Sequence, residues 1–300
     1  MHTCRAIVLR FLPHGLLAAL MFCCLCADSS ELTIVQTGKA TSVAFPELQR
    51  RVQRGDTEAM FQMAVAYRRG LGVERNDAEA ARWYRKAADR GHAGAQSSLG
   101  VLYSVGSGVP RDDEQAVSWY LRAAVAGDCT AQHNLGTMIA HGRAPRMEAA
   151  DAIRWFEKAA VKPECAQSAY ALGVAYDLGR GTQTDPARAA SYYKTAAERG
   201  IAPAQFNLAL MYATGRGVAQ NARQAVHWFE KAAGQFPEAE SCIALLYRKG
   251  IGVTADVRKA DEWMQRASAH GVKPYSDALP NAIAPQAPLT AQTQTDEMQH

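Results

Sequence analysis

A cysteine and two histidines lie close together in the middle of this 300-residue chain. Cys129 and His133 are four residues apart, so on a helix they share one face, and His141 follows two turns later. Thiolate and imidazole are preferred zinc ligands. However, two later segments of similar sequence carry Tyr170 and Phe206 where this one has His133. We therefore interpret His133 as a packing residue, and we predict no metal site and no cofactor.

A serine and a lysine one helical turn apart are a second candidate pair. Ser191-Tyr-Tyr-Lys194 has the Ser-x-x-Lys spacing of penicillin-interacting enzymes. Those enzymes also carry Ser-Asp-Asn and Lys-Thr-Gly motifs, and neither occurs here. Comparable positions elsewhere in the chain hold mixed polar residues, which is typical of a solvated face. We predict no catalytic residues, and a penicillin-interacting hydrolase is only a remote alternative.

Both candidate pairs lie within a repeat that covers most of the chain. Six positions 35 to 37 residues apart mark it: Tyr67, Tyr103, Ile139, Tyr176, Tyr212 and Tyr247. Each is followed by a glycine three residues later, an alanine thirteen later, an aromatic residue sixteen later and another alanine twenty later. Six copies in phase predict a repeat architecture.

Each repeat is expected to form two helices. Apolar or small residues four and eight positions before each marker share a face with it, so they predict a buried stripe on the first helix. Three positions before each marker only glycine or alanine occurs, which predicts close approach of a neighbouring helix. A capping residue nine positions after the marker starts the second helix: Asn76, Asp112, Glu148, Asp185, Asn221 or Asp256. Such short pairs bury their apolar faces only by stacking.

These motifs resemble a known repeat family. The segment Ala95-Gln-Ser-Ser-Leu-Gly-Val-Leu-Tyr103, then Gly106-Ser-Gly-Val, then Ala116-Val-Ser-Trp-Tyr-Leu-Arg-Ala-Ala124, closely resembles a Sel-1-like repeat, and the resemblance covers residues 56–271. It implies an all-α, right-handed α/α superhelical solenoid of six helix-pair repeats, related to tetratricopeptide repeats. The resemblance also implies an adaptor role, because exported bacterial members of the family act as adaptors in envelope assembly, signalling or host contact.

The two ends differ from the repeats. Residues 1–27 have the positive start and short apolar run of a signal peptide. Residues 28–55 are expected to include a partial capping repeat, and residues 272–300, rich in proline, alanine, glutamine and threonine, a disordered tail. We expect an exported protein. The periplasm is the favoured location, and secretion or an uncleaved membrane anchor are the alternatives. A cleaved signal would leave no stable membrane span.

Three cysteines remain beyond the signal: Cys129, Cys165 and Cys242. An oxidising compartment permits a disulfide, but three cysteines cannot all pair within one chain. The sequence favours buried free thiols. Some members of the family carry regularly spaced cysteine pairs that staple each repeat, and we do not expect that subtype here.

Charge excludes one class of partner. Without Arg5 and Arg10 of the signal, the chain carries 31 Lys/Arg against 29 Asp/Glu, and no basic run stands out. Nucleic-acid binding needs a concentrated positive face, so we predict none.

A second apolar stripe suggests where a protein or peptide partner binds. It lies two and six positions before the markers, on the side of the first helix away from the buried stripe. By resemblance to tetratricopeptide repeats these residues line a concave groove: Phe61, Val65, Val101, His133, Thr137, Tyr170, Val174, Phe206, Leu210 and Leu245, edged by Arg68, Asp177 and Arg248. Phe61, Tyr170 and Phe206 are the expected anchors, and packing of the same side chains remains the alternative. The function predicted is an interaction scaffold, with a secreted effector or adhesin as the alternative.

Overall fold

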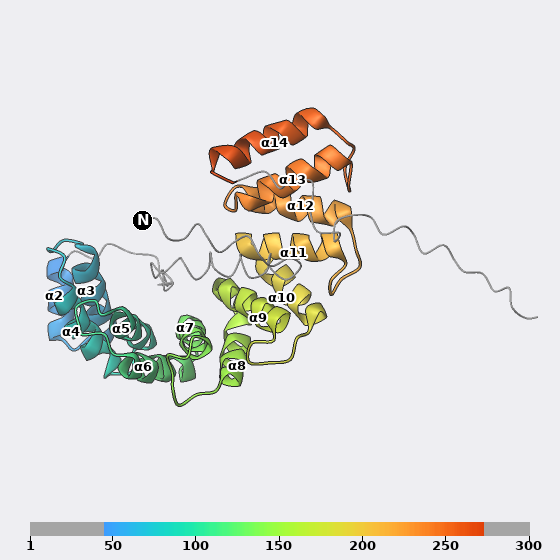
Figure 1. Cartoon of the computed structure of the whole chain (residues 1–300). Coiled ribbons are helices and arrows are strands. Elements are labelled where there is room, and N and C mark those ends of the chain that lie inside the picture. The colour runs from blue at the N-terminus through green and yellow to red at the C-terminus, as the bar shows by residue number, and fades with distance from the viewer. Residues whose placement is uncertain (1–44, 273–300) are drawn as a thin grey trace, which may run out of the picture. The chain divides into compact units, whose positions relative to one another are not determined.

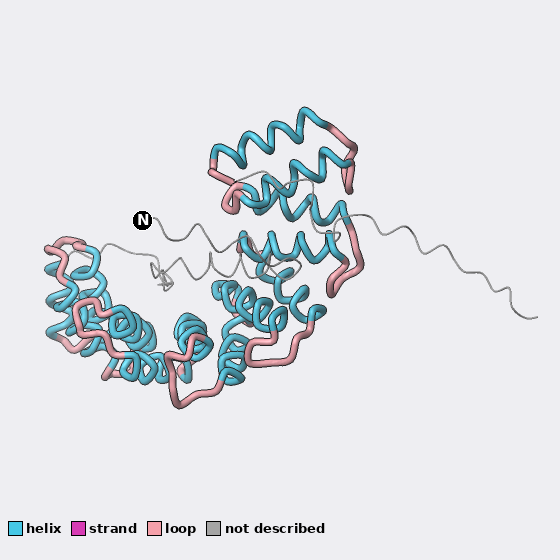
Figure 2. Tube along the Cα trace, in the orientation of Figure 1, coloured by secondary structure: helices cyan, strands magenta, loops and turns pink. Residues whose placement is uncertain are grey.

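The computed structural model describes residues 45–272, so the predicted signal peptide and most of the predicted tail lie outside the described residues. Within them the chain forms thirteen α-helices and one short 3-10 helix, with no strand (Figure 1). Figure 2 shows that the loops join consecutive helix ends. The described residues fall into two compact units, 45–204 and 205–272. The all-α, solenoid-type fold predicted from the sequence is confirmed.

Each repeat consists of a first and a second helix, preceded by the single helix α2 (Phe45–Gln53). The first helices are α3 (Thr57–Arg69), α5 (Ala93–Val105), α7 (Cys129–Ala140), α9 (Ala166–Leu178), α11 (Ala202–Thr214) and α13 (Glu238–Lys249). The second helices are α4 (Asp77–Ala88), α6 (Asp113–Val125), α8 (Ala149–Ala160), α10 (Pro186–Glu198), α12 (Ala222–Ala233) and α14 (Val257–Ala269). The 3-10 helix η1 (Pro163–Cys165) precedes α9.

The predicted capping residues begin the second helices. The side chain of Asn76 accepts a hydrogen bond from the Glu79 amide at 2.9 Å, and Asp112 accepts one from the Gln115 amide at 2.9 Å. These bonds satisfy backbone donors that the first turn of a helix leaves unpaired. At the other end of the first helices, Gly70 adopts the left-handed conformation that closes a helix, with φ of 70°.

Small residues on the first helices allow the second helices to approach closely, as the sequence predicted. A Cβ atom added to Gly100 would lie 2.7 Å from the ring of Tyr120, and one added to Gly173 would lie 2.5 Å from the ring of Tyr193. The absence of a side chain therefore makes room for an aromatic ring of the same repeat.

A glycine in the loop between the two helices of a repeat lies against the previous repeat. A Cβ atom on Gly108 would overlap the backbone carbonyl of Asp77, at the start of the preceding second helix. The third repeat has the buried Ala144 at this position. There the neighbouring Arg143 bonds Asp113 through two nitrogens, at 2.5 and 3.0 Å. The repeats are thus joined by backbone contact at one junction and by an ion pair at another.

Helix α2 covers the open side of the first pair. Leu48 on α2 is 5% exposed and packs with Met63 of α3. The ring of Phe45 meets the ring of Tyr67 edge to face at 5.6 Å. Among residues 45–272, no helix is both long enough and apolar enough to cross a membrane.

Candidate interaction surface

The residues of the predicted groove differ in how much solvent they reach. Arg248 is exposed, and eight are half-buried: Phe61, Val65, Arg68, His133, Thr137, Tyr170, Val174 and Leu210. Four are buried: Val101, Asp177, Phe206 and Leu245. The predicted row is therefore not one continuous surface.

Aromatic contacts inside four of the six repeats explain part of this burial. In these repeats the residue six positions before the marker carries a ring, which packs against a second-helix ring of the same repeat. The centroid distances are 5.7 Å for Phe61 and Tyr84, 5.6 Å for His133 and Phe156, 5.9 Å for Tyr170 and Tyr193, and 5.4 Å for Phe206 and Phe229. One side of each ring thus holds the helix pair together, as the packing alternative proposed.

Phe206 is inside the protein, not on its surface. Only 1% of it is exposed, because a second ring, Phe236, covers it at a centroid distance of 4.7 Å. Four other repeats have glycine where the fifth has Phe236: Gly91, Gly127, Gly200 and Gly271. That substitution was a signal in the sequence that Phe206 would be covered. We therefore remove Phe206 from the expected anchors.

Val101, Leu245 and Asp177 are also buried, so we remove them from the predicted surface. Their exposed fractions are 4%, 6% and 5%. The carboxylate of Asp177 accepts a hydrogen bond from the hydroxyl of Tyr193 at 3.4 Å, so it belongs to the interior of its repeat and does not edge a groove.

The half-buried residues of the unit 45–204 form the candidate surface. We call it the first-helix face and define it as Phe61, Val65 and Arg68 of α3, His133 and Thr137 of α7, and Tyr170 and Val174 of α9. In Figure 1, α5, α7 and α9 lie on the inner side of the row of helices in this unit, and α6 and α8 on its outer side. The face combines aromatic and branched apolar side chains with one arginine, which is the composition of many binding hot spots. Leu210 and Arg248 belong to the other unit.

His92 extends this face beyond the predicted set. Its ring stacks on Phe61 at 4.5 Å, its Nε2 lies 2.9 Å from a carboxylate oxygen of Glu58, and its Nδ1 accepts a hydrogen bond from the Ala95 amide at 3.0 Å. The last contact makes His92 the N-cap of α5, a position that aspartate takes before α3 and α7. A histidine among capping aspartates was the sequence signal for it.

The imidazole of His133 contacts the fourth repeat. Its Nδ1 lies 2.9 Å from the hydroxyl oxygen of Ser168. Burial lowers the pKa of His133 from 6.5 to about 4. In the part of the chain that the structure describes, no group of three or more His, Cys, Asp or Glu side chains could hold a metal ion.

The lowered pKa of His133 predicts a pH-dependent stability. Between pH 6.5 and about 4, the unfolded chain binds a proton at this histidine and the folded chain does not, so stability falls as the pH falls through this window. We expect a loss of about 2–3 kcal/mol from this group. His133→Phe keeps a ring against Phe156 and should flatten this part of the profile in urea unfolding at stepped pH. If the unfolding free energy fell equally with pH in the two proteins, this prediction would be contradicted.

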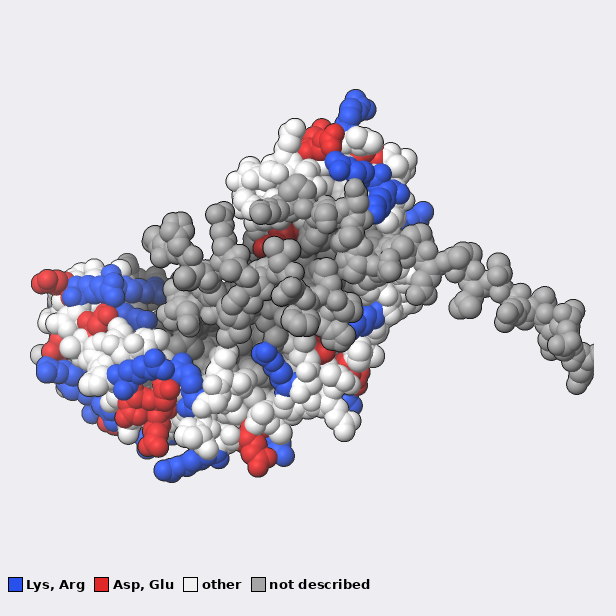
Figure 3. Space-filling model, in the orientation of Figure 1, with Lys and Arg blue, Asp and Glu red and all other residues white. Residues whose placement is uncertain are grey.

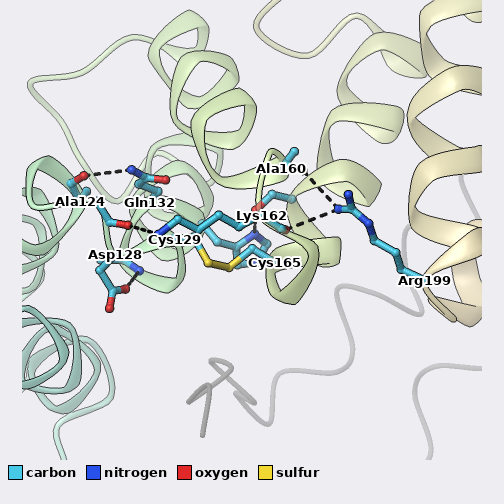
Figure 4. The surroundings of a disulfide bond; sticks show 12 residues. Ala124, Asp128, Cys129, Gln132, Ala160, Lys162, Cys165 and Arg199 are labelled. Atoms are coloured by element: carbon cyan, nitrogen blue, oxygen red, sulfur yellow. Dashed lines mark hydrogen bonds between the residues drawn. A yellow bond between two sulfur atoms is a disulfide. The ribbon is translucent and has the colours of Figure 1, made fainter. Parts of the chain in front are cut away.

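The prediction of free thiols is wrong for two cysteines. Cys129 and Cys165 form a disulfide with a Cα–Cα distance of 6.2 Å (Figure 4). It joins the start of α7 to the end of η1, and so links the third repeat to the fourth. The separation of 36 residues is one less than the 37 between the markers of these two repeats, so Cys129 is the first residue of α7 and Cys165 takes the N-cap position of α9. Cys242 is buried elsewhere.

Charged and amide side chains around the disulfide also join neighbouring repeats. Lys162 Nζ donates to the Gly127 carbonyl at 2.7 Å, and Gln132 Nε2 donates to the Ala124 carbonyl at 3.0 Å. Arg199 donates to the Ala160 carbonyl at 3.2 Å (Figure 4). Each of these acceptors lies at or just after the end of a second helix, where backbone carbonyls lack helical partners.

Comparison with known families decides what kind of repeat this is. The Sel1 repeat model matches residues 57–92, 93–128, 130–160, 166–201, 202–235 and 237–272. The chain belongs to the Sel1 repeat family. Sel1 repeat proteins are generally protein–protein interaction scaffolds without enzymatic activity.

Two solved structures of the family are similar to this Sel1 repeat protein. One is a protective antigen present in uropathogenic Escherichia coli strains that displays an SLR fold, with 31% identity, a TM-score of 0.73 and coverage of 77% of this chain. The present chain spans about half of that protein, 49% of its length. The other is a Sel1 repeat protein from Oxalobacter formigenes, with 28% identity, a TM-score of 0.61, and coverage of 78% of this chain and 98% of the other. A comparison with curated proteins found no match.

The Ser-x-x-Lys pair lies on a solvated face of the fourth Sel1 repeat. Ser191 and Lys194 are both exposed on α10, and Lys194 Nζ lies 3.9 Å from a carboxylate oxygen of Glu198. Lysine and arginine are interspersed with aspartate and glutamate on the visible surface (Figure 3). Ser191 thus lies in the mixed polar environment that the sequence predicted.

Proposed function

We propose that this Sel1 repeat protein is an exported, non-enzymatic scaffold that binds another protein or peptide through its first-helix face. The observation that carries the proposal is the half-buried set Phe61 and Val65 on the first repeat and Tyr170 and Val174 on the fourth. Each ring is already held on one side by a second helix, so it loses little side-chain freedom when a partner covers its other side. The scaffold role of the family supports the same conclusion.

The disulfide supports export. Structural disulfides form and persist in oxidising compartments and are rare in the cytosol. The bond between Cys129 and Cys165 is therefore the feature of the described residues that best fits a periplasmic or secreted protein.

A host-facing role is the second candidate. It is favoured by the similarity to the Escherichia coli protein, which is a protective antigen. Fractionation separates the two proposals: mature protein in the periplasm favours an envelope scaffold, and mature protein in the medium favours an effector or adhesin.

The scaffold proposal is tested by in-cell crosslinking and affinity capture with the mature chain from Asp28. The test variant carries Val65→Ser and Val174→Ser on the first-helix face. The matched control carries Val125→Ser and Val161→Ser, which remove two valines that are 74% and 78% exposed on second-helix ends.

We expect the test variant to lose about tenfold or more of the captured partner, because apolar anchors in an interface each contribute about 1–2 kcal/mol. The control should capture as the unmodified chain does. Equal circular dichroism and melting profiles establish that the variants are folded. Equal capture by both variants would remove the first-helix face from the account.

A further inference from the structure

The junction between the third and fourth repeats differs from the other junctions of its unit. The markers Ile139 and Tyr176 are 37 residues apart, where the two preceding spacings are 36. The family match stops at residue 160 and resumes at 166. Between them lies η1, so an irregular segment connects α8 to α9.

Helix α9 also lacks the side-chain cap that starts α3, α5 and α7. The side chains of Asp56, His92 and Asp128 accept hydrogen bonds from backbone amides at the starts of α3, α5 and α7, at 3.0, 3.0 and 2.7 Å. The residue in that place before α9 is Cys165, which makes no side-chain capping bond. The start of α9 therefore lacks a contact that holds the starts of α3, α5 and α7.

The disulfide attaches the start of α9 covalently to a neighbouring helix. It connects Cys165 to Cys129, the first residue of α7, whose own cap Asp128 is in place. Both cysteines are buried, 6% and 4% exposed, and cluster with Ala159 of α8. A covalent bond thus ties the uncapped helix to a capped helix of the neighbouring repeat.

The same junction carries part of the first-helix face. His133 lies one turn after Cys129 on α7, and Ser168 lies three residues after Cys165 on α9. The 2.9 Å contact between His133 Nδ1 and Ser168 Oγ spans the junction, and Tyr170 follows two residues later. The relative position of α7 and α9 therefore determines how these face residues are presented.

We propose that the Cys129–Cys165 disulfide is a covalent lock that holds α9 against α7 and thereby sets the first-helix face in its binding arrangement. Reduction breaks the S–S bond with two electrons and two protons and leaves two thiols. A dithiol supplies both and is itself oxidised to a disulfide. The effect on binding rests on the function proposed above, whereas the effect on α9 does not.

Hydrogen exchange of the mature chain tests the lock. The samples are the oxidised protein, the protein reduced with dithiothreitol, and the variant with Cys129→Ser and Cys165→Ser. In the last two we expect amides of residues 161–172 to exchange about tenfold faster or more, because the uncapped start of α9 opens locally. Amides of α3 and α5 should keep their protection, which shows that the chain remains folded.

Two further arms make the result specific. Dithiothreitol should change nothing in the double serine variant, since it has no bond to break. Thiol counting confirms reduction of the unmodified chain. Unchanged exchange at residues 161–172 after complete reduction would overturn the proposal.

Capture of the partner tests the link to binding. Partner recovered by the oxidised chain should fall severalfold for the reduced chain and for the double serine variant. Faster exchange with undiminished capture would overturn control of binding by the lock. If the oxidised chain itself captures no partner, the proposed function fails, and the exchange result still decides whether the lock exists.

Discussion

Replacing Gly108 by alanine should destabilise the protein by about 3–5 kcal/mol, because the cost of backbone strain and the cost of steric overlap add together. Gly108 has a φ of +68°, where L-residues are strained, and its missing Cβ would overlap the carbonyl of Asp77. That carbonyl is backbone at the start of α4 and cannot rotate aside. The alanine can be accommodated only by moving one repeat away from the next.

The matched control is Gly91→Ala. Gly91 has a φ of +86°, but a Cβ there would meet nothing within 4 Å. It should lose only about 1 kcal/mol, the cost of the backbone strain alone. Urea unfolding measures both free energies. Equal losses would show that this glycine contact does not hold the repeats together.

Phe206→Ala should cost about 3–5 kcal/mol of unfolding free energy, the usual loss for a buried phenylalanine. Its ring is 1% exposed and contacts the rings of Phe229 and Phe236, so its removal leaves a cavity between α11 and α12. Partner capture by the folded fraction should be unchanged, because this ring reaches no surface.

Phe61→Ala is the counterpart at the same position of the first repeat. Phe61 is half-buried, so its truncation should cost less stability than that of Phe206, about 1–2 kcal/mol, and should weaken capture instead. Thermal unfolding and capture on the same samples separate the two roles. A larger stability loss for Phe61→Ala than for Phe206→Ala would contradict the assignment.

The sequence predicted the helix pairs well, because their determinants recur in every repeat. Asn76 and Asp112 have the local chemistry of helix caps, and their bonds form within three residues along the chain. Gly100 and Gly173 are small for a reason that their repeated position already indicated, namely contact with a second helix. Features of this kind depend on neighbours in sequence or on the repeat itself.

The surface was harder to predict, because it depends on single departures from the repeat. Phe61 and Phe206 share a position, yet only Phe206 is fully buried. Phe236 covers it where four other repeats have glycine, whereas His92 stacks on Phe61 and leaves it half-buried. The pairing of Cys129 with Cys165 similarly depends on the contact of α7 with η1, which local sequence patterns do not encode. The 36-residue separation of the cysteines, close to the length of one repeat, was the one signal for it.

The most direct test of the interaction-scaffold account is site-specific photocrosslinking in the cell. A photoreactive amino acid is placed at residue 65 or 174 on the first-helix face, and at residue 125 or 161 on second-helix ends as the reference. The account predicts one discrete crosslinked partner from positions 65 and 174, and none of it from positions 125 and 161. The same partner from positions 125 and 161 alone would contradict the account, because binding would then use the ends of the second helices.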